Sequence, residues 1–118
     1  MDALTINEAA ATTGWSPRML RYVEQAGLVA PARSAAGYRL YGAGELQRLR
    51  TLKELLASFG VSLSDVAFAR RLQTDTRLRE DVDAWLRSEA TRPAHVEAED
   101  WLRFEQEKHE RLLAAAAA

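Results

Sequence analysis

The 118-residue sequence predicts a mainly α-helical protein with one small β-hairpin. Over most of the chain, apolar residues recur every three or four positions, which is typical of amphipathic helices. Residues 28–41 are the exception, because two short extended segments flank a tip of small residues there, and this pattern predicts a hairpin. Residues that suit helix caps precede several of the helical segments, so local chemistry sets where those helices begin.

A capping box marks the start of the first predicted helix. The Thr5 hydroxyl can accept a hydrogen bond from the Glu8 backbone amide, and the Glu8 carboxylate can reach back to Thr5. We expect this helix to end near Thr12. The turn at residues 13–15 leads into another helix, and this order is that of a helix-turn-helix motif.

The second predicted helix lies within residues 16–28 and has a basic face. Ser16 and Pro17 suit its start, and Gly27 suits its end. Its apolar side chains can face a core, whereas the opposite face carries Arg18, Arg21, Tyr22 and Gln25. Arginine and tyrosine can contact phosphates and base edges, so this segment is a candidate DNA-recognition helix.

The predicted hairpin runs from residue 28 to residue 41, with its tip at residues 34–37. Successive side chains of a strand face opposite sides. We therefore expect Tyr38 and Leu40 on one side, and Arg39 and Tyr41 on the other. The hairpin would form a wing, and we expect Tyr41 to support this wing and not to contact DNA.

Further helices are expected after the hairpin. Leucines at helical spacing predict one over residues 43–59, which Gly60 ends, and a capping box at residues 62–65 begins another. The predicted domains are residues 1–74, for DNA binding, and residues 75–118, a helical region for dimerisation or effector binding. Pro93 interrupts this second region, and helix resumes from Ala94 until the terminal alanines fray.

Charge is distributed unevenly along the chain, although the net charge is only −1. Residues 16–53 hold seven basic and two acidic groups, whereas residues 61–118 hold nine basic and twelve acidic groups. The excess of basic groups in residues 16–53 favours binding to a polyanion such as DNA. No apolar stretch is long enough for a membrane span, and the N-terminus lacks the features of a signal peptide, so we expect a cytoplasmic protein.

Several classes of protein are excluded by composition. There is no cysteine, which excludes disulfides and thiolate metal or redox sites, and the only histidines are His95 and His109. We therefore expect no metal site and no cofactor. No nucleophile with its base, phosphate-cradling glycine loop or metalloprotease motif occurs, so we do not expect an enzyme.

Five ordered segments resemble the DNA-binding domain of the MerR family of transcriptional regulators. They are residues 4–10, 18–24, 27–29, 37–41 and 59–63. The resemblance covers residues 4–66 and departs from the family pattern at Trp15, which replaces a small aliphatic residue, and at Val23, which replaces an aromatic one. We expect Trp15 to pack in the core, as large aromatic residues usually do.

The resemblance implies a winged helix-turn-helix domain in a homodimer that binds a near-palindromic promoter site and distorts it for RNA polymerase. It would place Arg18, Arg21 and Tyr22 at the major groove. The wing residues Tyr38 and Arg39 would lie against the DNA backbone or in the minor groove.

Two further candidate regions are less specific. Arg48, Arg50 and Lys53 could add phosphate contacts, although basic residues on such a helix ordinarily form a solvated face. The C-terminal aromatic residues could bind a cationic organic effector or form the dimer interface, and we prefer packing. These residues are Trp85, Trp101 and Phe104.

The main alternative is a protein-binding module on the same fold, similar to the small chaperone-modulating relatives of this family. The acidic and apolar C-terminal region could serve a protein partner as well as a second subunit. Basic residues on both the second helix and the wing favour DNA, because a protein-binding module does not need them in both places.

Overall fold

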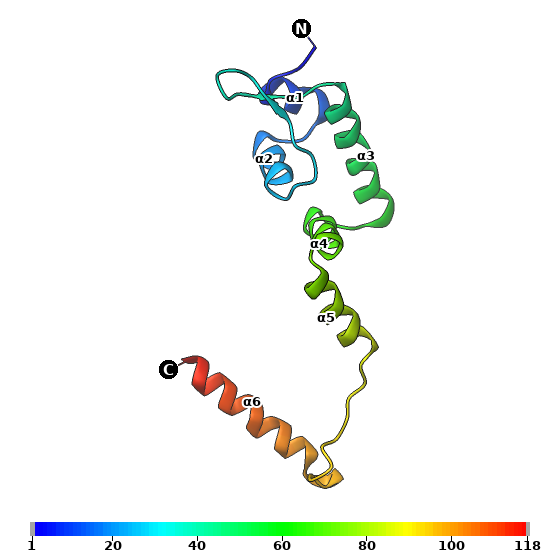
Figure 1. Cartoon of the computed structure of the whole chain (residues 1–118), viewed down its shortest axis with the longest axis vertical. Coiled ribbons are helices and arrows are strands. Elements are labelled where there is room, and N and C mark those ends of the chain that lie inside the picture. The colour runs from blue at the N-terminus through cyan, green and yellow to red at the C-terminus, as the bar shows by residue number, and fades with distance from the viewer. Residues whose placement is uncertain (1, 118) are drawn as a thin grey trace. The chain divides into compact units, whose positions relative to one another are not determined.

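The computed structural model describes residues 2–117, which form six α-helices, one 3₁₀ turn and a two-stranded antiparallel sheet (Figure 1). The predicted fold class is confirmed. The chain divides into two compact units, Met1–Asp81 and Val82–Ala118, and the division falls inside helix α5 (Thr76–Arg87). Within residues 2–117, no helix is long and apolar enough to cross a membrane.

Helices α1 (Ile6–Thr13) and α2 (Pro17–Gln25) form the predicted helix-turn-helix. The capping box at Thr5 is present, because the Glu8 amide donates to the Thr5 hydroxyl over 3.3 Å and the Thr5 amide donates to the Glu8 carboxylate over 3.0 Å. These two hydrogen bonds hold the pKa of Glu8 below its ordinary value. Ser16 caps α2 by accepting a hydrogen bond of 3.1 Å from the Met19 amide.

The hairpin is shorter than predicted. Strand β1 (Ala32–Arg33) pairs with β2 (Arg39–Leu40), so that Arg33 lies opposite Arg39. The pairing does not extend back through the preceding residues, where Pro31 has no N–H to donate. Beyond β2, the backbone of Tyr41 instead pairs with Leu4 through two hydrogen bonds of 2.8 Å. The hairpin is therefore joined to the start of α1.

Helices α3 (Ala43–Phe59) and α4 (Leu63–Thr74) complete the first unit. Gly60 ends α3 in the left-handed region, at φ 62°, as its sequence position predicts. The apolar stripe of α3 is only partly covered, since Leu49 is buried but Phe59 is 73% exposed. The core side chains of this unit are those of Ala9, Trp15, Leu20, Val23, Val29, Tyr41, Leu49, Leu52 and Leu63.

Trp15 packs in this core, as predicted, with 8% of its surface exposed. Its indole N–H donates to the Leu49 carbonyl of α3 over 3.2 Å. The Lys53 ammonium lies 5.4 Å from the centre of the Trp15 ring and donates to the Thr13 carbonyl at the end of α1 over 3.2 Å. The turn between α1 and α2 is thus fixed to α3.

A single residue, Asp75, separates α4 from α5. Its backbone N–H donates to the Arg71 carbonyl over 2.8 Å, which ends α4. Its carboxylate accepts a hydrogen bond of 3.0 Å from the Leu78 amide in the first turn of α5. The same residue therefore ends one helix and caps the next.

The second unit is helical at both ends, with an irregular segment between them. Helix α5 ends at Arg87, and helix resumes with the 3₁₀ turn η1 (Ala98–Asp100) and α6 (Trp101–Ala117). Residues near Pro93 are not helical, as predicted, but the expected restart at Ala94 is wrong, because Val96 is buried and closes a turn onto the Pro93 carbonyl. Helix α6 continues as far as Ala117, so the fraying of the terminal alanines stays a prediction, and Ala118 lies outside the described residues.

The Tyr41 hydroxyl generates a prediction on stability. This group is buried, and among the described residues it has no hydrogen-bond partner. Burial, and then the charge of Glu24, raises the pKa of Tyr41 above its ordinary value. Because an unpaired buried hydroxyl is costly, Tyr41→Phe should raise the free energy of unfolding by about 1 kcal/mol in urea titrations.

The control for this substitution is Tyr38→Phe, because Tyr38 is 72% exposed. It removes the same atom from a solvated position, so the free energy of unfolding should stay nearly constant. A clear loss of stability in Tyr41→Phe would contradict the prediction and would show that the hydroxyl is satisfied, for example by a buried water molecule.

Candidate nucleic-acid interface

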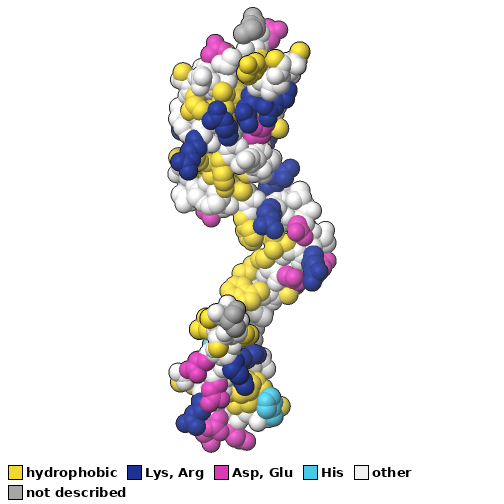
Figure 2. All heavy atoms as spheres, turned by 90° about the vertical axis from the view of Figure 1, so that its left-hand side faces the viewer, with side chains coloured by type: hydrophobic (Ala, Val, Ile, Leu, Met, Phe, Trp, Pro, Cys, Tyr) yellow, Lys and Arg dark blue, Asp and Glu magenta, His cyan; other side chains and the backbone are white. Residues whose placement is uncertain are grey.

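The outer face of α2 is basic and solvent-exposed. Leu20 and Val23 turn inward, each with 1% of its surface exposed, as the helical spacing predicts. Arg18, Arg21 and Tyr22 lie on the exposed side. In Figure 2, basic side chains gather on the surface of the first unit that carries the hairpin and α2. This face is open to a large partner.

Two hollows flank α2, and an arginine of α2 borders each of them. The first measures about 440 Å³ and lies between α2, the hairpin and the start of α1; it is lined by Thr5, Ile6, Asn7, Arg21, Arg33, Gly37, Tyr38 and Arg39. The second measures about 570 Å³ and lies toward the start of α4; it is lined by Trp15, Arg18, Met19, Tyr22, Leu56, Ser62, Leu63 and Ser64. Positive charge therefore reaches both sides of the helix.

The carboxylate of Glu24 joins α2 to both strands of the hairpin. Its Oε1 accepts a hydrogen bond of 2.7 Å from Nε of Arg39, and its Oε2 accepts one of 2.9 Å from Nη2 of Arg33. The Arg33 guanidinium also donates from Nη1 to the Gly37 carbonyl at the hairpin tip, over 3.1 Å. The angle between α2 and the hairpin is therefore fixed by charge-assisted hydrogen bonds.

The two predicted wing residues face opposite ways, as expected from the strand pattern. The Tyr38 side chain is directed to solvent, whereas the Arg39 side chain points toward α2 and is only 26% exposed. Tyr41, on the same side as Arg39, is buried in the core. The hairpin thus presents one aromatic group outward and holds one arginine at the border with α2.

The basic residues of α3 have local partners. Arg48 donates from Nη2 to the Leu28 carbonyl over 3.0 Å, and Lys53 donates to Thr13. Arg50 makes only a long ion pair, of 3.9 Å, with Glu54. Arg48 and Lys53 therefore have structural roles that the sequence did not indicate, and a DNA contact of any of the three stays a prediction.

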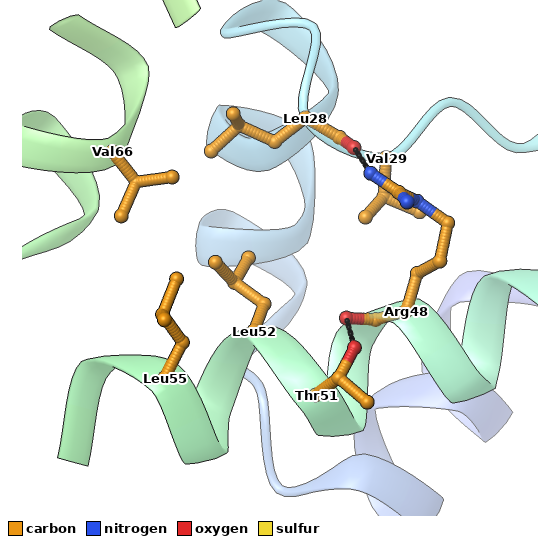
Figure 3. A pocket seen from close by; sticks show the side chains of 7 residues that line it. All are labelled: Leu28, Val29, Arg48, Thr51, Leu52, Leu55 and Val66. Carbon is orange, nitrogen blue, oxygen red and sulfur yellow. Dashed lines mark hydrogen bonds between the residues drawn. The ribbon is translucent and has the colours of Figure 1, made fainter. Parts of the chain in front are cut away.

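Arg48 lies at the edge of a mainly apolar hollow of about 330 Å³ (Figure 3). Leu28 and Val29 come from the segment after α2, Leu52 and Leu55 from α3, and Val66 from α4. In Figure 3 the guanidinium of Arg48 reaches across to the Leu28 carbonyl, and the Thr51 hydroxyl bonds to the Arg48 carbonyl. The end of α2 is thereby tied to α3.

The C-terminal aromatic candidates have different surroundings. Trp85 is 74% exposed on α5. In α6, the Trp101 indole donates to the Glu105 carboxylate over 3.3 Å, and the Phe104 ring meets the His95 ring edge to face, with centroids 5.8 Å apart. Among residues 2–117, no three His, Asp or Glu side chains are placed so that they could hold a metal ion.

Sequence reasoning missed the roles of Glu24, Arg33 and Arg70. In the sequence, Glu24 enters only as one of the two acidic groups of residues 16–53, although it is the one carboxylate of α2 and lies among basic residues. The guanidinium of Arg70 lies over Gly27, where an added β-carbon would come within 2.9 Å of it. The lone acid was a usable signal, but no local pattern indicates the contact of Arg70, which comes from α4.

Residues 4–73 match a protein family described as "MerR HTH family regulatory protein". Two curated relatives are the HTH-type transcriptional regulator HmrR of Sinorhizobium medicae and the heavy metal-dependent transcription regulator 2 of Rhizobium meliloti. Each is 36% identical to the chain over 83 residues, which are 69% of this chain and 56% of the relative. The chain therefore spans little more than half the length of these relatives.

One solved structure is similar in fold. It is HiNmlR, a MerR family regulator lacking the sensor domain, which was crystallised bound to promoter DNA. The TM-score is 0.50 at 21% identity, and the match covers 98% of this chain and 85% of that chain. The family and these proteins are regulators, in agreement with the expectation that the chain is not an enzyme.

The contact of Arg48 generates a second prediction. Arg48→Ala should lower the free energy of unfolding by about 1 kcal/mol, because the Leu28 carbonyl loses a charged donor. Arg50→Ala is the matched control, since its exposed pair with Glu54 should contribute little. Equal effects of the two substitutions in urea unfolding would refute the structural role of Arg48.

Proposed function

Because the chain belongs to the MerR family of HTH regulatory proteins, as the match over residues 4–73 shows, we propose that it is a sequence-specific DNA-binding transcriptional regulator. The observation that carries the proposal is the exposed face of α2, which has an arginine toward each of its two flanking hollows. A protein that binds promoter DNA works in the compartment that holds the DNA, which fits the expected cytoplasmic location.

In the proposed complex, α2 lies in the major groove, which is wide enough to admit an α-helix. Arg18 and Arg21 donate to phosphates or to guanine, and Tyr22 contacts a thymine methyl group or a phosphate. On the hairpin, Tyr38 and Arg39 contact the backbone or the minor groove. The ion pairs of Glu24 support this arrangement, because they hold the hairpin and α2 as one body.

We further propose a homodimer that binds a near-palindromic site, distorts it and so affects RNA polymerase. The support is the apolar surface of the second unit, where Trp85 is 74%, Leu86 67% and Leu102 73% exposed. A soluble chain seldom leaves so many large apolar groups in water, and a second copy would cover them. A closed two-fold dimer would present two copies of α2 to the two half-sites.

We infer that these 118 residues do not themselves hold an effector metal through thiolates. Two relatives match over only part of their length, and one of them is named for heavy metals, whereas these 118 residues contain no cysteine. A cationic organic ligand near Trp85 or Trp101 remains our candidate, with the nearby acidic side chains as counter-charges.

The third prediction concerns the affinity for DNA. Arg21→Ala should weaken binding by about 1–3 kcal/mol if the guanidinium makes a bidentate contact with a base. The measurement is fluorescence anisotropy with a duplex obtained by selection from random sequences, at fixed moderate salt. Arg79→Ala, which removes an exposed arginine of α5, is the control and should bind as the unmodified chain does.

Two outcomes would decide against the proposal. If the unmodified protein shows no preference for any duplex in the selection, sequence-specific DNA binding is wrong. If it also recovers one stoichiometric protein partner from a cell extract, the protein-binding module becomes the better assignment.

The fourth prediction concerns assembly. Sedimentation equilibrium should give about twice the chain mass of 13.2 kDa. Trp85→Ala should weaken the dimer by about 2 kcal/mol, as truncation of a central interface tryptophan does. Phe59→Ala removes an aromatic side chain that is also exposed but lies on the first unit, so it should leave the dimer intact. A monomer at all concentrations would contradict the proposal.

A further inference from the structure

Glu24 is the one acidic side chain among the arginines that border α2 and the hairpin. Arg21, Arg33 and Arg39 line the hollow beside it, so the cluster has three positive charges and one negative charge. The Glu24 side chain is 18% exposed, and both of its carboxylate oxygens are used.

The two hairpin arginines are engaged differently. Arg33 uses both terminal nitrogens, because Nη1 donates to the Gly37 carbonyl and Nη2 donates to Glu24. Arg39 donates to Glu24 through Nε, the nitrogen nearest the stem. An arginine held only at Nε keeps all four N–H groups of its two terminal nitrogens for another acceptor, whereas one held once at each terminal nitrogen keeps a single N–H on each.

We propose that Glu24 is the positioning residue that decides which hairpin arginine contacts DNA. By holding Nε of Arg39, it aims the terminal amino groups of that arginine at a phosphate. By binding Nη2 of Arg33, it withholds Arg33 from the DNA and keeps that arginine as a brace of the hairpin tip. This inference rests on the proposed function and assigns the phosphate contact within it.

Specificity follows from this arrangement. A freed Arg33 would add a contact to phosphate, which carries no information about sequence. It would therefore strengthen binding to every duplex and reduce the ratio of specific to non-specific affinity. The carboxylate restrains non-specific binding, because it neutralises one cation of the hairpin.

The test measures the dependence of DNA affinity on salt. Each phosphate contact contributes about 0.9 to the slope of log affinity against log salt. Glu24→Gln removes the charge but keeps one acceptor oxygen, which can still hold Nε of Arg39, whereas its amide NH2 group cannot accept from Arg33. It should steepen the slope by about 0.9 and raise the affinity for a non-specific duplex several-fold. Adding Arg33→Ala to Glu24→Gln should return the slope to that of the unmodified chain.

A second pair of variants leaves Glu24 intact. It tests the same proposal even if the Glu24→Gln substitution prevents folding. Arg39→Gln should reduce the slope by about 0.9, whereas Arg33→Gln should leave it unchanged. Circular dichroism and urea titration establish that each variant is folded before its slope is compared.

The outcomes separate this inference from the proposed function. Suppose that the unmodified chain binds its selected duplex but that Arg33→Gln and Arg39→Gln reduce the slope equally. The positioning role of Glu24 is then wrong, whereas the proposed function as a DNA-binding regulator still holds. An unchanged slope in a folded Glu24→Gln variant also overturns the assignment. If the unmodified chain binds no duplex, both the function and this inference fail.

Discussion

The orientation of α2 depends on Trp15, which joins the helix-turn-helix to α3. Its indole N–H donates into the backbone of α3 at Leu49, and the ammonium of Lys53 covers the ring while it satisfies the end of α1. A small aliphatic residue at position 15 could make neither polar contact. The basic face of α2 is therefore aimed by a buried aromatic side chain that does not itself lie on that face.

Local signals predicted the elements, and contacts between distant residues could not be predicted. Thr5, Ser16 and Gly60 set helix ends through neighbours within a few positions, so their roles were readable from the sequence. The acceptor of Arg48 lies 20 positions away, and the partners of Glu24 lie 9 and 15 positions away. Such pairs come together only in the folded chain. The sequence alone therefore predicts a solvated basic face on α3 and does not reveal the partners of Arg48 and Lys53.

The second unit differs from the first in how few side chains it buries. Its helices bury no side chain of their own, and Val96 in the irregular segment is its buried apolar residue. The proline at position 93 indicated the interruption but not its length, because the restart of the helix depends on where the turn at Val96 closes. Large apolar side chains at helical spacing predict a packed face, whereas in the single chain these side chains are exposed.

Asp75 is the single residue that connects α4 to α5. Its amide completes α4, and its carboxylate caps the first turn of α5. The same helix α4 carries Arg70, whose guanidinium lies over Gly27 at the end of α2. A substitution at Asp75 would therefore disturb two helix ends at once, and one of the two helices carries the arginine that covers Gly27.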